Sequence, residues 1–272
     1  MNPMSPAPRQ SFFQAWGRVF SVFFAFGRRS RRFKIYVALS QMPVVIAVFA
    51  QVNQAFQGQG FNSALLFFSK GIMSFDLQFL VLLLVLFYGT SICLEEVEGR
   101  TLMYLTTRPV PKAAVILGKY AAYILFLVIM INVGIILSFL VLNLRTVGNL
   151  SVYPVLFQYV GVLTLAILAY TAFFTLLGTL SKRALVLGLM FSFGWEAVVQ
   201  YFPGATQRFT IAHYLKSLLP SQTTTGGLSF LTYRLEPTAP LLSVAVLLLL
   251  TVVFLTAACL VFSYKDFILS TD

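Results

Sequence analysis

The 272-residue chain has little of the side-chain chemistry on which enzymes and metalloproteins depend. It contains one histidine and two cysteines, which excludes a His-rich metal site. The phosphate-binding pattern GxxxxGK[ST] is absent, and so are HExxH and GxSxG. The aspartates, Asp76, Asp266 and Asp272, lie near the ends of apolar runs or at the C-terminus, which argues against two facing catalytic aspartates inside a membrane. We therefore predict that the chain is not an enzyme.

Charged residues are also scarce, at 10% of the chain, against about 25% in a typical soluble domain. Hydrophobic residues make up 59%, and the mean hydropathy is +0.88. A water-soluble fold cannot hide that much apolar surface. The apolar residues form continuous blocks of about 20, the length that a helix needs to cross the hydrocarbon core. A membrane barrel would show alternating segments instead, so the sequence predicts an all-α membrane protein.

Six transmembrane helices can be placed on these apolar blocks. The predicted spans are residues 34–53, 74–94, 114–142, 156–180, 184–202 and 239–262. The stretches between them are too short to bury a core of their own, so we expect residues 1–272 to form a single transmembrane domain. Nucleic-acid binding is a poor interpretation of the net charge of +11, because the basic residues are spread over membrane-adjacent segments.

The distribution of lysine and arginine predicts the orientation of the chain. With the N-terminus inside, 14 of the 19 basic residues fall on inner segments and five on outer ones, in agreement with the positive-inside rule. Both termini are therefore expected on the cytoplasmic side. The positive charge on that side also favours contact with anionic membrane lipid.

Two segments outside the spans show helical periodicity. In residues 11–33, apolar and aromatic side chains recur at three- and four-residue steps before a basic end. This pattern predicts an amphipathic helix in the inner membrane interface; a positively charged flank of the first span is the alternative. The longest outer segment, 203–238, carries a similar pattern in residues 209–219 and predicts a short helix at the outer interface or dipping into it.

Glu196 is the one ionisable residue clearly inside a predicted span. Intramembrane carboxylates are costly and usually face a cavity or a partner. Glu196 is therefore either a polar point on a transport path or a structural carboxylate bonded to neighbouring helices or to the outer segment, near Arg208 or His213. His213 itself is interpreted as an interfacial or packing residue rather than a ligand. Asp76 is expected to cap the outer start of the second span, and contact with the substrate is the alternative.

Residues 95–112, called the charged segment below, separate the second and third predicted spans on the inner side. The segment holds three of the eight acidic residues and three of the nineteen basic ones. A short helix can form in its middle, and the Arg-Pro-Val-Pro sequence at 108–111 then forces an extended turn. A rigid element joined to two spans can transmit force from a soluble partner. An ordinary solvated loop is the alternative.

The charged segment resembles the signature of ABC-2-type transporter permeases. In that family an acidic residue, Gly, Thr-Leu, a Leu-(Ser/Thr) turn with Pro-Val, and a Gly-Lys pair follow the second span. The matching residues here are Glu98, Gly99, Thr101, Leu102, Leu105, Thr106, Pro109, Val110, Gly118 and Lys119. The later stretches 194–197 and 211–218 also resemble the subgroup that includes the nitrous-oxide-reductase maturation permease.

The resemblance implies an ABC-2 half-transporter with a type V exporter-like architecture, in the cytoplasmic membrane of a bacterium or archaeon. Two copies would pair as a homodimer, or one copy would pair with a distinct second permease. Each half would dock one cytosolic ABC ATPase subunit, which binds ATP and Mg²⁺; no cofactor is expected in this chain. Residues 11–33 would be a connecting helix, and 203–238 would close the exit. The ATPase-coupling residues would be Glu95, Glu96, Glu98, Gly99, Arg100, Thr101, Leu102, Leu105, Arg108 and Pro109.

Two other classes stay open on the residues alone. A non-transporting membrane anchor or scaffold would use the charged segment to hold a soluble partner. An ion-coupled secondary transporter would usually show inverted repeats and several buried charges, of which Glu196 is a single example. The Phe- and Leu-rich spans suit an amphipathic or lipid-like cargo, and they equally suit contact with lipid.

Overall fold

The structure of the chain is a computed structural model in which every regular element of the described part is helical. The described residues are 12–29, 31–57, 67–98, 112–144, 152–181, 183–199, 205–219 and 238–264. Five helices in this part are long and apolar enough to cross a membrane. Their ranges are Phe33–Asn53, Met73–Ile92, Lys112–Leu142, Tyr153–Leu180 and Pro240–Tyr264. The all-α membrane fold predicted from the apolar blocks is confirmed, with bounds close to those expected.

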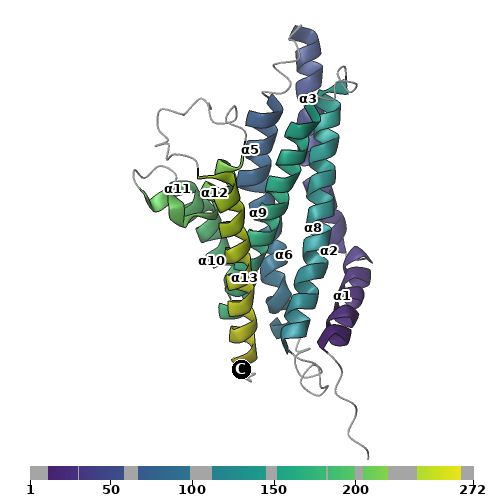
Figure 1. Ribbon diagram of the computed structural model, residues 1–272. Coiled ribbons are helices and arrows are strands. Elements are labelled where there is room, and N and C mark those ends of the chain that lie inside the picture. The colour runs from purple at the N-terminus through teal and green to yellow at the C-terminus, as the bar shows by residue number, and fades with distance from the viewer. Residues whose placement is uncertain are drawn as a thin grey trace, which may run out of the picture.

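The centre of the bundle is α9 (Tyr153–Leu180), which packs against α6 (Val81–Glu98), α8 (Lys112–Leu142) and α13 (Pro240–Tyr264). These four helices run side by side along the length of the molecule (Figure 1). Because lipid tails are as apolar as the side chains, such helices associate through close packing rather than through exclusion of water. Gly89 allows that packing, since a Cβ there would lie 2.7 Å from Cβ of Phe174.

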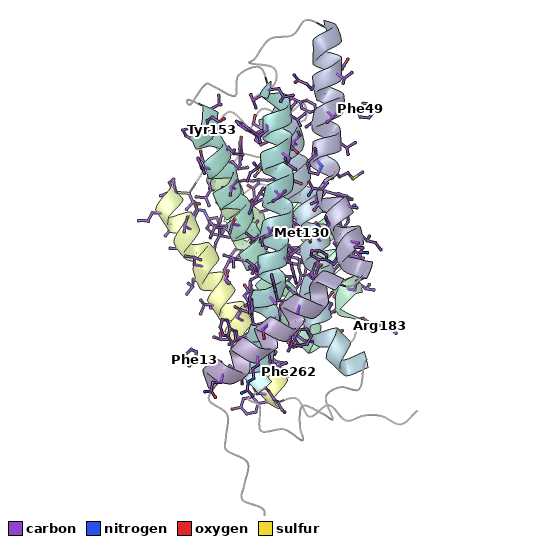
Figure 2. The ribbon with its side chains drawn as sticks, turned by 90° about the vertical axis from the view of Figure 1, so that its right-hand side faces the viewer. Phe13, Phe49, Met130, Tyr153, Arg183 and Phe262 are labelled. Carbon is purple, nitrogen blue, oxygen red and sulfur yellow. The ribbon has the colours of Figure 1, made fainter. Side chains whose placement is uncertain are left out.

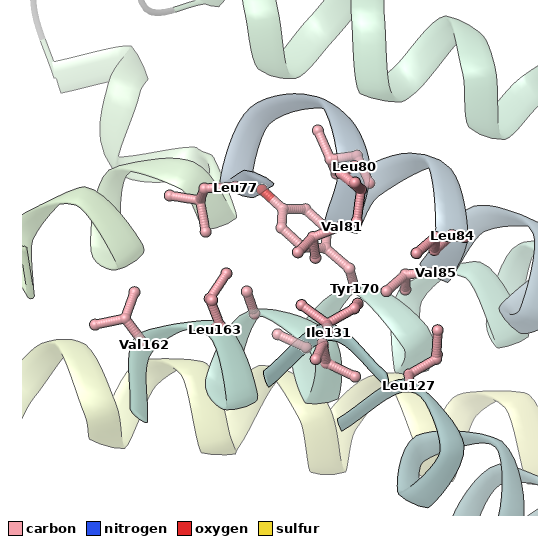
Figure 3. Close-up of a cluster of buried hydrophobic side chains, with 14 of the residues drawn as sticks. Leu77, Leu80, Val81, Leu84, Val85, Leu127, Ile131, Val162, Leu163 and Tyr170 are labelled. Carbon is pink, nitrogen blue, oxygen red and sulfur yellow. The ribbon is translucent and has the colours of Figure 1, made fainter. Parts of the chain in front are cut away.

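Buried aliphatic and aromatic side chains fill the space between α6, α8 and α9. Figure 3 shows this core, with the ring of Tyr170 from α9 reaching toward the helix that leads into α6. The side chains that surround Tyr170 in that view include Leu77, Leu80, Val81, Leu84, Val85, Leu127, Ile131 and Leu163. The core therefore fixes α9 relative to both of the helices that flank the charged segment.

The sixth apolar helix is short and interrupted. It begins as α10 (Ala184–Leu189), continues through the π-helical turn η5 (Met190–Trp195) and ends as α11 (Glu196–Val199). Its apolar part covers Ala184–Trp195, whereas the sequence predicts a span over 184–202. A π-helical turn breaks the regular i to i−4 ladder and is often found at functional sites. The interruption places Glu196 just beyond the apolar stretch.

Three helices precede the bundle. α1 (Phe12–Arg29) packs against α8, α2 (Arg31–Ser40) follows it, and α3 (Met42–Gln57) lies along the far part of α8. Figure 2 places Phe13, Arg183 and Phe262 at one end of the molecule and Phe49 and Tyr153 at the other. The predicted topology likewise puts the N-terminal helix, the turn before α10 and the end of α13 on one side. This end is called the inner end below.

Candidate functional site

The two helices that flank the charged segment meet at the inner end. α6 ends at Glu98 and α8 begins at Lys112, so Glu95, Glu96 and Glu98 belong to the last turns of α6. The other predicted coupling residues lie outside the described part of the chain. They are Gly99, Arg100, Thr101, Leu102, Leu105, Arg108 and Pro109. The structure therefore defines the base of the charged segment, and the coupling role of these ten residues stays a prediction.

Lys119 joins three helices at this base. Its side chain is 1% exposed, although it carries an ammonium group on an otherwise apolar part of α8. Nζ donates a hydrogen bond to the carbonyl oxygen of Ile92 in α6 at 3.2 Å, and it lies 4.4 Å from the ring centroid of Phe23 in α1. An ammonium over an aromatic face is attracted by the ring quadrupole, more strongly where water is excluded. One side chain thus links α1, α6 and α8.

The neighbouring Gly118 brings α1 and α8 into close contact. A Cβ at this position would lie 2.7 Å from Cγ1 of Val19 and 3.2 Å from the carbonyl oxygen of Trp16. Real Cβ atoms essentially never approach another atom within 3.0 Å, so any larger residue would push α1 away. Farther along the same contact, the rings of Phe24 and Phe126 stack at 4.8 Å.

The first residue of α8 is fixed to the end of the last helix. Nζ of Lys112 donates a hydrogen bond to the carbonyl oxygen of Ser263 at 3.3 Å. This contact is exposed, so its contribution to stability is small. It nevertheless places the end of α13 beside the point where the chain leaves the charged segment.

The sequence identified Gly118 and Lys119 only as a motif and did not predict what they contact. A usable signal was present, because a lysine seven residues inside a long apolar helix must find a partner or reach the interface. Which partner it finds depends on the packing of α1, and spacing along the chain does not contain that information.

A second cluster of polar contacts surrounds Glu196 at the other end of the interrupted helix. The carboxylate is 5% exposed. Oε1 accepts a hydrogen bond from the backbone N–H of Ile211 at 3.1 Å, and Oε2 accepts one from that of Ala212 at 3.2 Å. Tyr170 in α9 and Lys216 in α12 also lie close enough to interact with the same carboxylate.

These contacts fix the short helix α12 (Ile211–Ser217). The first N–H groups of a helix have no partner within the helix, and Glu196 satisfies two of them from outside. The N-cap residue Thr210 satisfies a third by accepting from the N–H of His213 at 3.3 Å. The partners of Glu196 are thus backbone groups of residues 211 and 212, which lie between the two side chains named from the sequence, Arg208 and His213.

Two further contacts attach α12 to the bundle. Nε2 of Gln158 in α9 donates to the carbonyl oxygen of Leu218 at 2.7 Å. Nε2 of His213 lies 3.0 Å from the hydroxyl of Thr238, just before α13. α12 is therefore held by α9, α11 and the start of α13 together.

Burial changes the titration of the two basic side chains on α12. Burial lowers the pKa of His213 below its ordinary 6.5, and the nearby positive charges of Arg208 and Lys216 lower it further. Burial also lowers the pKa of Lys216, while the negative charge of Glu196 partly offsets this change. His213 is neutral at pH 7 and acts as a packing residue with one polar contact, as its isolation in the sequence indicated.

Asp76 is not a helix cap, contrary to the sequence-based expectation. It is the first residue of the π-helical turn η2 (Asp76–Leu80), which continues α5 (Met73–Phe75) without a break, and it has φ −60° and ψ −52°. Its side chain is 1% exposed, and neither carboxylate oxygen has a hydrogen-bond partner among the described residues. The expectation failed because the chain is already helical at Phe67, well before Asp76.

Within the described part of the chain, no group of three or more His, Cys, Asp or Glu side chains is placed to hold a metal ion. The polar contacts found there serve to join helices instead. Two groups of them lie around Lys119 at the inner end and around Glu196 at the other end of the bundle, and others, such as Asn132 to Thr164, join α8 to α9.

Comparison with known proteins gives one family. The model of a family described as ABC-2 family transporter protein matches residues 28–195, which is more than half of the chain and includes both flanks of the charged segment. No curated protein matches the sequence.

Proposed function

The chain belongs to the ABC-2 family of transporter proteins and is a membrane-spanning permease component; from that premise we propose that it serves an ATP-driven exporter whose ATPase is a separate cytosolic chain. The subgroup around the nitrous-oxide-reductase maturation permease is proposed on the resemblance of residues 194–197 and 211–218 alone. A neighbouring gene that encodes a phosphate-loop ATPase would support the proposal that the partner is a separate ATPase chain.

The observation that carries this proposal is the construction of the base of the charged segment. At the inner end, α6 leads into the charged segment and α8 follows it. Lys119 links both helices to α1. Lys112 adds the end of α13. Packed helices move as rigid bodies rather than deform continuously. A displacement of the charged segment would therefore reach four helices at once, which is what a coupling element requires.

The energy must come from another chain, because the sequence has no phosphate-binding loop. We propose that each permease docks one cytosolic ABC ATPase on the charged segment, so that a pair of permeases carries two. MgATP would bind to the ATPases and not to this chain. In such a scheme, ATP favours one of two arrangements of the helices and thereby shifts the population of outward-open permease.

The outer elements support export as the direction of transport. α12 is fixed across α9, α11 and the start of α13 by contacts from Gln158, Glu196 and Thr238. A short helix fixed in this way is suited to close the outer end until the bundle rearranges. We propose that cargo leaves past α12.

Co-expression of the permease with candidate cytosolic ATPases tests the proposal. A stable complex should purify, and its ATP hydrolysis should fall when the charged segment is altered by Glu98→Lys or Arg108→Glu. Arg183→Glu is the matched control, because Arg183 is an exposed cation at the same end of the molecule outside the charged segment. Failure of every candidate ATPase to bind would reject the proposal. Binding without movement of cargo across reconstituted vesicles would favour a scaffold.

A further inference from the structure

We propose that Gly118 and Lys119 form a joint that makes α1 move together with the two helices flanking the charged segment, so that ATP hydrolysis stays coupled to rearrangement of the bundle. This inference rests on the proposed function and assigns positioning roles to two residues of α8. Neither residue is proposed to touch the ATPase or the cargo.

Gly118 supplies the close contact on which the joint depends. The backbone of α1 passes so near to α8 that the carbonyl oxygen of Trp16 would lie 3.2 Å from a Cβ at position 118. Small residues allow this approach between membrane helices, and close packing provides the attraction. α1 is thereby held by its backbone as well as by its side chains, which limits how far it can slide along α8.

Lys119 ties this contact to α6. Burying an ammonium group costs several kcal/mol, even when the group has a partner, and an apolar side chain would fill the same volume at lower cost. The charge instead holds the Ile92 carbonyl on one side and the Phe23 ring on the other. Because Ile92 lies less than two turns before the end of α6 at Glu98, Lys119 acts close to the point where the charged segment begins.

α1 is amphipathic and is attached to the bundle by one of its faces. Ala15 faces the protein and is 2% exposed, whereas Gln14, Arg18 and Ser21 are on the exposed face. A helix attached in this way follows the inner ends of α6 and α8 when they move. Detaching it should leave the docking surface for the ATPase intact while reducing the fraction of ATP turnovers that move the bundle.

The first arm of the test uses the permease alone, in detergent, with Trp16 as the reporter. The chain has two tryptophans, and Trp195→Phe leaves Trp16 beside the Gly118 contact. Gly118→Ala and Lys119→Met should shift the Trp16 emission and raise its quenching by acrylamide, because α1 separates from α8. The matched controls are Gly161→Ala, where a Cβ meets nothing within 4 Å, and Asn132→Leu, which removes a buried polar side chain of α8 far from α1. Neither control should change the signal.

The second arm uses the permease–ATPase complex. Lys119→Met should leave the amount of co-purified ATPase unchanged while the permease-dependent change in ATP hydrolysis falls about tenfold, as a loss of about 1.4 kcal/mol of coupling would give. Lys119→Arg should restore most of it, because a guanidinium can also contact the Phe23 ring and donate to the Ile92 carbonyl.

The outcomes separate this inference from the proposed function. Unchanged Trp16 quenching in both variants, or unchanged coupling in Lys119→Met, would overturn the inference. Loss of ATPase binding in Lys119→Met would also overturn it, since the residue would then act in docking. If the wild-type permease binds no ATPase, the proposed function fails, and the Trp16 signal still decides whether the pair holds α1. If Lys119→Met does not fold, Gly118→Ala against Gly161→Ala decides both arms.

Discussion

Glu196 and Asp76 are both carboxylates buried in the bundle, and their surroundings are opposite. Glu196 accepts two backbone hydrogen bonds from α12, and Tyr170 and Lys216 lie close to it. Asp76 has no hydrogen-bond partner for either oxygen within the described residues. Both stand beside π-helical turns, η5 and η2 respectively. The same residue chemistry, at the same kind of helix irregularity, therefore serves different purposes.

The difference shows what a buried acid contributes to a membrane bundle. A carboxylate with donors beside it stabilises the elements that donate, and its removal leaves those donors unpaired. A carboxyl group without donors costs free energy and stabilises nothing within reach. Glu196 thus holds the outer helix α12, whereas Asp76 stabilises no hydrogen-bond donor among the described residues.

The largest effect is expected from Glu196→Leu. The substitution leaves the N–H groups of Ile211 and Ala212 without their acceptor, and it should lower the free energy of unfolding by about 3 kcal/mol. The midpoint of thermal unfolding in detergent measures the loss. Ser192→Ala is the control, since this buried hydroxyl one turn earlier has no hydrogen-bond partner among the described residues. An unchanged midpoint in Glu196→Leu would mean that α12 is held by other contacts.

Tyr170→Phe should give the next largest effect. It removes a hydroxyl that lies close to the Glu196 carboxylate and keeps the ring in the core, which predicts a loss of about 1.5 kcal/mol. In the Glu196→Leu background the same substitution should cost much less, because the carboxylate is already absent. Equal costs in both backgrounds would show that the two residues do not interact.

Asp76 should respond in the opposite direction. Asp76→Leu removes a buried polar group that lacks donors and should raise the free energy of unfolding by about 1 kcal/mol. Asp76→Asn should leave it near the wild-type value. A clear loss of stability in Asp76→Leu would show that the carboxylate has a partner in the folded protein and would remove the contrast with Glu196. A stable Asp76→Leu protein that fails in transport would assign Asp76 to function.

The smallest effect concerns pH and His213. Its folded-state pKa lies below 6.5, so the unfolded chain takes up the proton first as the pH falls. Stability is therefore fully present above about pH 6.5 and is lost as the pH falls from there toward the folded-state pKa. The unfolding midpoints at about pH 7.5 and about pH 5.5 measure this loss. His213→Gln should reduce it, and an equal loss in that variant would assign the pH dependence to another group.

The spans were predictable because they depend on local patterns. Apolar blocks gave five full-length helices within a few residues, and a lone glutamate in the next block marked Glu196 as an exception. Its partners were not predictable, since Ile211 and Ala212 contribute backbone groups that carry no side-chain signal. Asp76 was misassigned because helix starts are read from the apolar edge, and this helix extends beyond that edge. The role of Lys119 depends on how α1 crosses α8, which is a tertiary property.

The interrupted sixth helix has a consequence for the membrane itself. Its apolar part, Ala184–Trp195, is about 18 Å long at 1.5 Å per residue, against about 30 Å of hydrocarbon in a typical bilayer. The 31-residue α8 exceeds that thickness. The protein therefore presents a short and a long apolar helix to the same bilayer, and a stretch as short as α10 and η5 is matched by local thinning, by snorkelling of flanking residues or by association of helices. In lipids of increasing chain length, the mismatch with the bilayer would become largest at this short helix. Bilayer thickness would therefore act on the helix that carries Glu196.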